Sequence, residues 1–212
     1  EAYAMAKDAI DKLNSWDLAY YKEQLKQERY QIDDNLLKPY FELNRVIDGA
    51  FAVAKKLYGI TFEERKDIQK YHPDVITYEV KNADGSHLAI FYADFFPREG
   101  KRNGAWMTSY RSQKMTANGD QRPHVSIVCN FTKPAGDTPS LLTHGEVTTL
   151  FHEMGHAIHA LLSKVTYRSM AGTNVLWDFV ELPSQVQENW CYEKETLDMF
   201  ATHYKTGEKI PT

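Results

Sequence analysis

The chain has 212 residues, of which 42% are hydrophobic and 13% aromatic, so it can bury a substantial core in one large domain or two small ones. Its formal net charge of -4 comes from interspersed charges without a basic stripe, which argues against nucleic acid as a partner. Two cysteines, Cys129 and Cys191, are too few for a disulfide framework, and we expect them to be buried thiols in a reducing compartment.

The sequence also argues against a membrane segment. No stretch approaches the roughly 18 to 20 continuous apolar residues that a membrane span needs. The first residues, EAYAMAKDAIDKL, are amphipathic rather than typical of a signal peptide, and the expected location is the cytoplasm. Because the chain begins without Met and ends at GEKIPT soon after a helical pattern, we expect an internal fragment of a longer protein. A removed signal peptide remains an alternative.

Residues 1–70 carry the pattern of a helical block. Apolar residues recur there at steps of three and four, as in Leu18, Tyr21, Leu25 and again in Phe51, Ala54, Leu57, Tyr58. Thr61 followed by Glu63 resembles the start of another helix with acidic residues in its first turn.

Residues 71–135 change to the pattern of strands. The runs 75–80, 87–96, 105–110 and 124–131 are rich in β-branched and aromatic residues, and turn signals containing Gly, Pro, Asn and Asp separate them. We predict a small antiparallel sheet.

Residues 140–205 are expected to be helical again. The segment from Thr143 to about Ser163 contains no proline, and its apolar residues wrap most of its circumference, as in a buried helix. A loop with Gly172 follows, and a further helix is expected near Val180. The fold class is therefore mainly α-helical (α+β).

The predicted buried helix contains the sequence FHEMGHAIH at residues 151–159. His152 and His156 lie four residues apart, so their imidazoles project from one helix face and can bind one Zn²⁺ ion per chain. Glu153, next to the first ligand, can act as the general base, and Gly155 would let a substrate or another segment approach closely. An HExxH pattern arises by chance in roughly two such sequences per hundred, but the apolar helical setting makes unpartnered imidazoles costly and favours a metal.

A catalytic zinc usually has a third protein ligand. His159 lies on nearly the same face, but at about 1.5 Å rise per residue it is roughly 10 Å from His152 along the helix, which is too far to share an ion. The remaining candidates are His144, Glu146, Asp178, Glu181 and Glu188. Spacing favours Glu181, at the start of ELPSQVQENW, and leaves Asp178 and Glu188 open, either of which could instead orient a ligand histidine.

Two segments together, HEMGHAIH and GTNVLWDFVELPSQVQENW, resemble the thimet oligopeptidase family of zinc metallopeptidases, most closely its bacterial peptidyl-dipeptidase (Dcp) branch. Residues 16–41, 57–80 and 91–107 fit the same branch, so the likeness covers nearly the whole chain. The resemblance implies that His152, His156 and Glu181 bind zinc and that Glu153 is the general base. It also implies a zincin-type catalytic region, of which residues 1–212 would be one part of a single domain.

The resemblance further implies hydrolysis of short peptides, with release of C-terminal dipeptides, by a full-length protein that is a monomer. An endo-acting oligopeptidase is the alternative within the family. A family segment that stabilises the oxyanion has no counterpart after Glu181, so a catalytically silent zinc-binding fragment is a second hypothesis. A helical module with an incidental motif is the third.

Residues expected to bind substrate come from two stretches. Gly104, Ala105 and Trp106 resemble a strand on which these enzymes lay an extended peptide, and Gly172 with Thr173 resembles a mobile segment near the substrate. An ordinary strand and a plain connector are the alternatives. The basic residues Arg98, Lys101 and Arg102 are expected to form a solvated hairpin tip.

Overall fold

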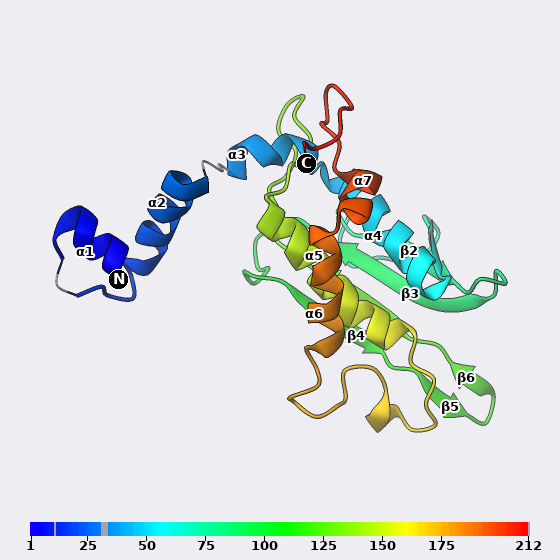
Figure 1. Cartoon of the computed structure of the whole chain (residues 1–212). Coiled ribbons are helices and arrows are strands. Elements are labelled where there is room, and N and C mark those ends of the chain that lie inside the picture. The colour runs from blue at the N-terminus through cyan, green and yellow to red at the C-terminus, as the bar shows by residue number, and fades with distance from the viewer. Residues whose placement is uncertain (11, 31–33, 212) are drawn as a thin grey trace. The chain divides into compact units, whose positions relative to one another are not determined.

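The computed structural model describes residues 1–10, 12–30 and 34–211, and the chain divides into two compact units, Glu1–Leu37 and Lys38–Thr212 (Figure 1). The first unit contains α1 (Ala2–Asp8), α2 (Leu18–Tyr30) and α3 (Asp34–Leu37), as the helical pattern predicts. Polar contacts join α1 to α2: the Tyr3 hydroxyl donates to Glu28 at 2.6 Å, and Lys7 donates to Gln24 at 2.8 Å. Because α2 is described in full and buries none of its residues, this unit depends on such contacts more than on an apolar core.

The second unit opens with the 3₁₀ turn η1 (Lys38–Tyr40) and α4 (Leu43–Tyr58). Glu42 caps α4 by accepting hydrogen bonds from the backbone N–H groups of Asn44 and Arg45. The helix buries one apolar stripe, made of Val46, Ile47, Ala50, Val53 and Ala54.

The prediction of a helix starting at Thr61 is wrong, because residues Thr61–Glu64 form the strand β1. Phe62 of this strand pairs with Val80 and stacks on Phe51 of α4, with ring centroids 4.0 Å apart. Strand pairing and this aromatic contact override the local helix signal.

Five strands form the main sheet, in the order β1-β2-β3-β7-β4. The other four are β2 (Ile76–Lys81), β3 (His87–Asp94), β7 (His124–Val128) and β4 (Trp106–Arg111). A separate hairpin consists of β5 (Lys114–Thr116) and β6 (Gly119–Gln121). The expected strands are therefore present, and the sheet is mixed rather than antiparallel, since β3 and β7 pair in parallel.

Burial explains why β7 separates β3 from β4. Four of the five residues of β7 are buried, from Val125 to Val128, which is typical of a central strand covered on both faces. Residues of β4 are half-buried or exposed, as suits an edge. In the chain, the β5–β6 hairpin follows β4 and precedes β7, so β7 can return between β3 and β4. Strand β4 is therefore the last strand of the sheet, and one of its edges is free.

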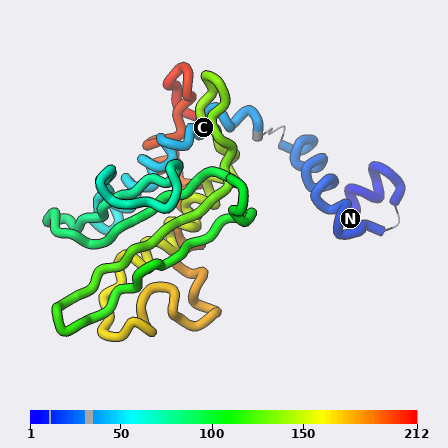
Figure 2. The backbone as a smooth tube through the Cα atoms, turned by 180° about the vertical axis from the view of Figure 1, so that it is seen from behind, coloured from blue at the N-terminus to red at the C-terminus, as the bar shows by residue number. Residues whose placement is uncertain are grey.

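Helices of the C-terminal half complete the second unit. They are α5 (His144–Leu161), α6 (Leu182–Glu188) and α7 (Lys194–Phe200), with the 3₁₀ turns η2 (Arg168–Met170) and η3 (Asn189–Tyr192). A capping box between Thr143 and Glu146 starts α5. α5 contacts β7 and β4, α4 contacts β1, and the strands lie in front of these helices in Figure 2, so the helices cover one face of the sheet.

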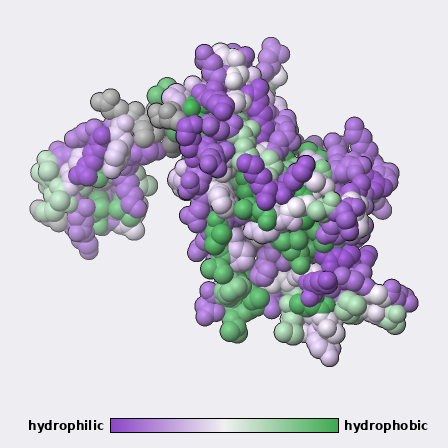
Figure 3. Space-filling view, turned by 45° about the vertical axis from the view of Figure 1, so that its right-hand side comes forward, coloured by the Kyte–Doolittle hydropathy of each residue, from purple (hydrophilic) through white to green (hydrophobic). Residues whose placement is uncertain are grey.

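The two cysteines are buried free thiols, as expected. Among the described residues, no helix is both long and apolar enough to cross a membrane. Apolar side chains nevertheless gather on parts of the surface (Figure 3), and several of the exposed ones belong to one stretch: Val175, Leu176, Trp177, Phe179 and Leu182.

Gly49 lets α4 and α7 pack closely, and we predict that Gly49→Ala destabilises the fold. A Cβ at this position would lie 2.3 Å from Cδ1 of the buried Phe200, so the variant should lose about 1–3 kcal/mol of unfolding free energy. Urea unfolding measures the loss. Gly145→Ala is the matched control, because a Cβ there meets its nearest neighbour at 3.9 Å and should leave stability equal or slightly higher. Equal stability of the two variants would contradict the packing argument.

Candidate metal centre

Three side chains converge at one point of the second unit, two from α5 and one from the residue just before α6. Glu181 Oε2 lies 3.2 Å from His152 Nε2 and 3.1 Å from His156 Nε2. One ligand atom from each residue lies within 4.8 Å of the others, and the two imidazole rings are nearly perpendicular, with centroids 4.9 Å apart. Two imidazole nitrogens and a carboxylate oxygen are a ligand set typical of zinc.

The sequence around Gly155 makes this convergence possible. α5 carries both histidines on one face, and α6 crosses it so closely that a Cβ on Gly155 would lie 2.5 Å from Ser184 Cα and 2.6 Å from the Pro183 carbonyl oxygen. Gly155 has no side chain, and this lets α6 approach closely. The sequence left open whether a substrate or another segment would approach here, and the structure shows another segment. Glu181 immediately precedes α6 and is thereby brought to the histidines.

Hydrogen bonds orient these groups. His152 Nδ1 lies 2.6 Å from Glu188 Oε1, on the side of the ring opposite to Glu181. The Ser184 hydroxyl donates to Glu181 Oε2 at 2.7 Å and, as the leading cause, lowers the pKa of that carboxyl below its ordinary value. Of the two carboxylates predicted to orient a histidine, Glu188 is in contact, and Asp178 is exposed.

Two of the remaining candidate ligands are engaged elsewhere. Glu146 accepts from the backbone N–H of Thr143 within the capping box. His144 Nε2 lies 3.1 Å from the Cys191 carbonyl oxygen. His159, on the next turn of α5, does not join the three-residue cluster; its ring centroid lies 6.4 Å from that of Phe179, in agreement with the helix geometry.

Glu153 is buried beside the histidines, with 6% of its surface exposed. Within the described part of the chain its Oε2 atom has no hydrogen-bond partner. Burial, followed by the negative charge of Glu181, raises the pKa of Glu153 to about 7, although nearby His152 acts in the opposite direction. A carboxyl group with a pKa near neutrality can both accept and release a proton at physiological pH.

A cavity of about 330 Å³ opens onto this cluster. Ala105, Trp106 and Thr173 line it, whereas Gly104 and Gly172, the other two residues expected to bind substrate, do not. Met107, Trp177 and Val180, which are not among the residues predicted from the sequence, also line the cavity. Met107 follows the predicted strand residues directly, and the sequence carries no signal that distinguishes the other two from loop residues.

A larger cavity of about 570 Å³ lies next to the first, since Thr173 lines both. Gly172 and Arg168 are among its lining residues, but the described residues that line it include no histidine, cysteine or carboxylate. The smaller cavity is therefore the one that holds groups able to bind a metal and move a proton.

Comparison with known proteins decides the family. The model of "Peptidase family M3" matches residues 1–212. The chain belongs to peptidase family M3. Family M3 relatives include oligopeptidase A of Escherichia coli, 45% identical over 212 residues, which cover 99% of this chain and 31% of the relative.

Relatives under another name match equally well. Dipeptidyl carboxypeptidase of Salmonella typhimurium is 45% identical over 200 residues, covering 94% of this chain and 29% of the relative. Organellar oligopeptidase A of Arabidopsis thaliana is 44% identical over 208 residues, covering 95% of this chain and 26% of the relative. The chain thus spans less than a third of the length of these curated M3 relatives, and the expected likeness to the family is confirmed.

The raised pKa of Glu153 predicts how the stability of the metal-free protein depends on pH. The ordinary pKa of a glutamate is 4.5, so between about pH 4.5 and 7 the unfolded chain loses a proton that the folded chain retains. The unfolding free energy should therefore fall by on the order of 2 kcal/mol as the pH rises through this window. Urea unfolding in the presence of a chelator at pH 5 and pH 8 measures the fall.

Glu153→Gln should remove most of this fall, because the amide does not ionise. Glu99→Gln makes the same change at an exposed glutamate and should leave the fall in place. A fall of the same size in both variants would show that Glu153 is not its source.

Proposed function

We propose that the protein hydrolyses peptide bonds in short peptides with the help of one zinc ion per chain. The observation that carries the proposal is the convergence of His152, His156 and Glu181 beside the buried, unpartnered oxygen of Glu153. Membership of family M3 and relatives named as oligopeptidases and dipeptidyl carboxypeptidases support the same reaction.

The residues present fit a zinc ion. Three ligand atoms of the preferred kinds already lie close together, and Glu181 is within hydrogen-bond distance of both imidazoles through one oxygen. The contact of His152 Nδ1 with Glu188 leaves Nε2 directed toward Glu181, as expected for a ligand histidine with a carboxylate partner. His152, His156 and Glu181 would hold the metal.

Bound zinc would supply a Lewis acid that polarises the scissile carbonyl and makes water acidic near neutral pH. Glu153 takes a proton from the attacking water and passes it to the departing amine. Its burial and its pKa of about 7 suit both steps, since the group must accept and release the proton in turn. Glu188 holds the ring of His152, and Ser184 holds the carboxylate of Glu181.

The edge strand β4 is the proposed binding site for the substrate backbone. It is the last strand of the sheet, Ala105 and Trp106 line the cavity at the candidate metal centre, and its free edge can accept an extended peptide as an additional strand. Thr173 bounds the same cavity from the loop before α6. Release of C-terminal dipeptides is the proposed mode, and endo-acting cleavage is the alternative, because relatives of both names are similar to the chain.

We predict that Glu153→Gln abolishes hydrolysis without loss of zinc. The variant keeps all three proposed ligands and removes only the base, so the protein at its full natural length should retain one equivalent of zinc and lose activity by about 10² to 10⁴-fold. Metal analysis and cleavage of short peptides measure the two effects. Wild-type activity in the variant, or a folded wild-type protein without zinc, would contradict the proposal.

A second prediction concerns Glu188. Because it contacts His152 Nδ1, Glu188→Ala should weaken zinc binding by about 10 to 100-fold, as measured by competition with a chelator of known affinity. Asp178→Ala, a change of the exposed carboxylate just before the site, is the control and should leave the affinity unchanged. Equal affinities of the two variants would remove Glu188 from its proposed role.

A further inference from the structure

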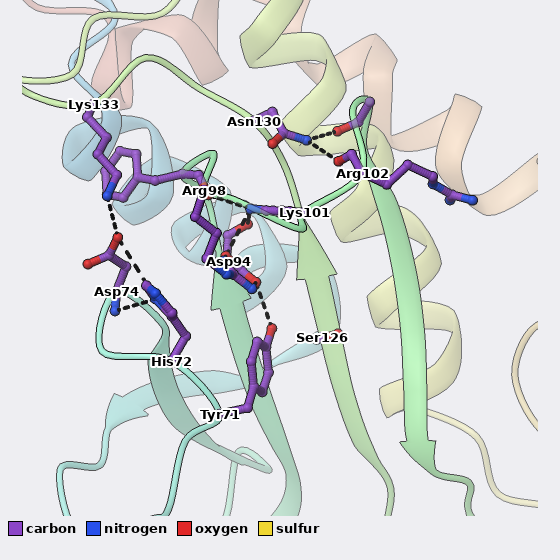
Figure 4. A network of polar contacts seen from close by, with 12 residues as sticks. Tyr71, His72, Asp74, Asp94, Arg98, Lys101, Arg102, Ser126, Asn130 and Lys133 are labelled. Carbon is purple, nitrogen blue, oxygen red and sulfur yellow. Dashed lines mark hydrogen bonds and ion pairs between the residues drawn. The ribbon is translucent and has the colours of Figure 1, made fainter.

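A buried ion cluster lies where β3 ends. Asp94 is 1% exposed, and its two carboxylate oxygens accept from the two terminal nitrogens of Arg98 at 2.7 and 2.9 Å. Lys101 Nζ donates to the same carboxylate at 2.9 Å, and the Tyr71 hydroxyl donates to it at 3.0 Å (Figure 4). Three side chains, from Arg98, Lys101 and Tyr71, thus donate to one buried carboxylate.

Lys101 also ties down the backbone of the segment that follows β3. Its side chain is 3% exposed, and Nζ donates to the carbonyl oxygens of Asp94 and Phe96 at 3.1 and 2.7 Å. The expectation of a solvated basic tip is wrong for Arg98 and Lys101, because an acidic partner lies buried beneath them. Arg102 alone is exposed, and its guanidinium lies 4.8 Å from the ring centroid of Trp106.

Asn130, in the segment after β7, binds the backbone just before β4, at the far end of the segment that joins β3 to β4. Its side-chain amide donates to the carbonyl oxygens of Arg102 and Gly104 at 2.9 and 2.7 Å (Figure 4). Gly104 adopts φ +90°, a left-handed conformation that few other residues take, so the backbone makes a defined turn there. Ala105 and Trp106, which line the cavity at the candidate metal centre, follow at once.

We propose that Asn130, supported by the Asp94–Lys101 pair, is a positioning residue that fixes the start of β4 for binding an extended peptide. The inference rests on the proposed function. An edge strand that is already ordered spares a substrate the entropy cost of ordering it, so the ordering strengthens binding of the peptide backbone. Asn130 acts through the Arg102 and Gly104 carbonyls, and the ligand class is a peptide in extended conformation.

Two substitutions of Asn130 test this role. Asn130→Ala removes the amide, and Asn130→Asp keeps its shape but turns a donor toward two carbonyl oxygens into an acceptor. In the protein at full natural length, both should raise KM for a hexapeptide about tenfold and change kcat less than twofold, since an interaction used equally in the ground and transition states affects KM. The control is Asn82→Ala, which removes an amide donor to Ser86 in the β2–β3 turn.

Two readouts do not require turnover. In a Glu153→Gln background the same Asn130 substitutions should raise the Kd of the hexapeptide about tenfold, and amide hydrogen exchange should become faster in residues 102–106 and stay unchanged in α5. Zinc content and the thermal midpoint should equal those of the Asn82→Ala protein. Unchanged Kd and unchanged exchange in both Asn130 variants would overturn the inference. If the wild-type protein cleaves no peptide, the proposed function fails, and Kd and exchange still decide the role of Asn130.

Discussion

The close crossing of α5 and α6 at Gly155 is the constraint on which the candidate site depends. A Cβ at this residue would overlap the backbone of Ser184, so any other residue would push α6 away and Glu181 with it. Glu181 and Glu188 lie seven residues apart, nearly two helical turns, and therefore project from similar sides of α6. His152 is consequently held between two carboxylates of one segment, Glu181 at Nε2 and Glu188 at Nδ1.

The rest of the fold supports this crossing from two directions. The capping box at Thr143 fixes the start of α5. The buried residues Leu150 and Phe151 anchor this helix in the core, so the helix cannot rotate and turn its two histidines away from Glu181. The sheet supplies the opposite wall, where β4 is an edge because β7 takes the central position. The same arrangement places a buried, electrostatically costly carboxyl, Glu153, next to the proposed ligands, as expected where stability is exchanged for function.

Most of the helices and strands could be predicted from the sequence, and the elements that could not be predicted depend on contacts between distant residues. Local periodicity is enough to predict α4, α5 and four strands, because apolar residues there follow one period over a long stretch. It is insufficient for β1, whose strand conformation depends on pairing with β2 and on the contact of Phe62 with Phe51. The parallel pairing of β3 with β7 depends on which strand is central, which no local pattern specifies.

The residues of the candidate site were likewise only partly predictable from the sequence. The placement of His152, His156 and Glu153 follows from helix geometry alone, whereas the choice of Glu181 required the family resemblance, and the separation of Glu188 from Asp178 required the structure. Arg98 and Lys101 look like a solvated turn in the sequence because their partner, Asp94, sits in a strand and becomes buried only in the folded sheet.

X-ray absorption spectroscopy of the zinc-loaded protein can test the proposed ligand set of His152, His156 and Glu181, because it identifies the atoms around the metal. We predict a site with two imidazole nitrogens and carboxylate oxygen, and no sulfur. His152→Ala should lose one imidazole, and Glu181→Ala should lose the carboxylate oxygen. A third imidazole in the wild type, a sulfur ligand, or a spectrum unchanged by Glu181→Ala would contradict it.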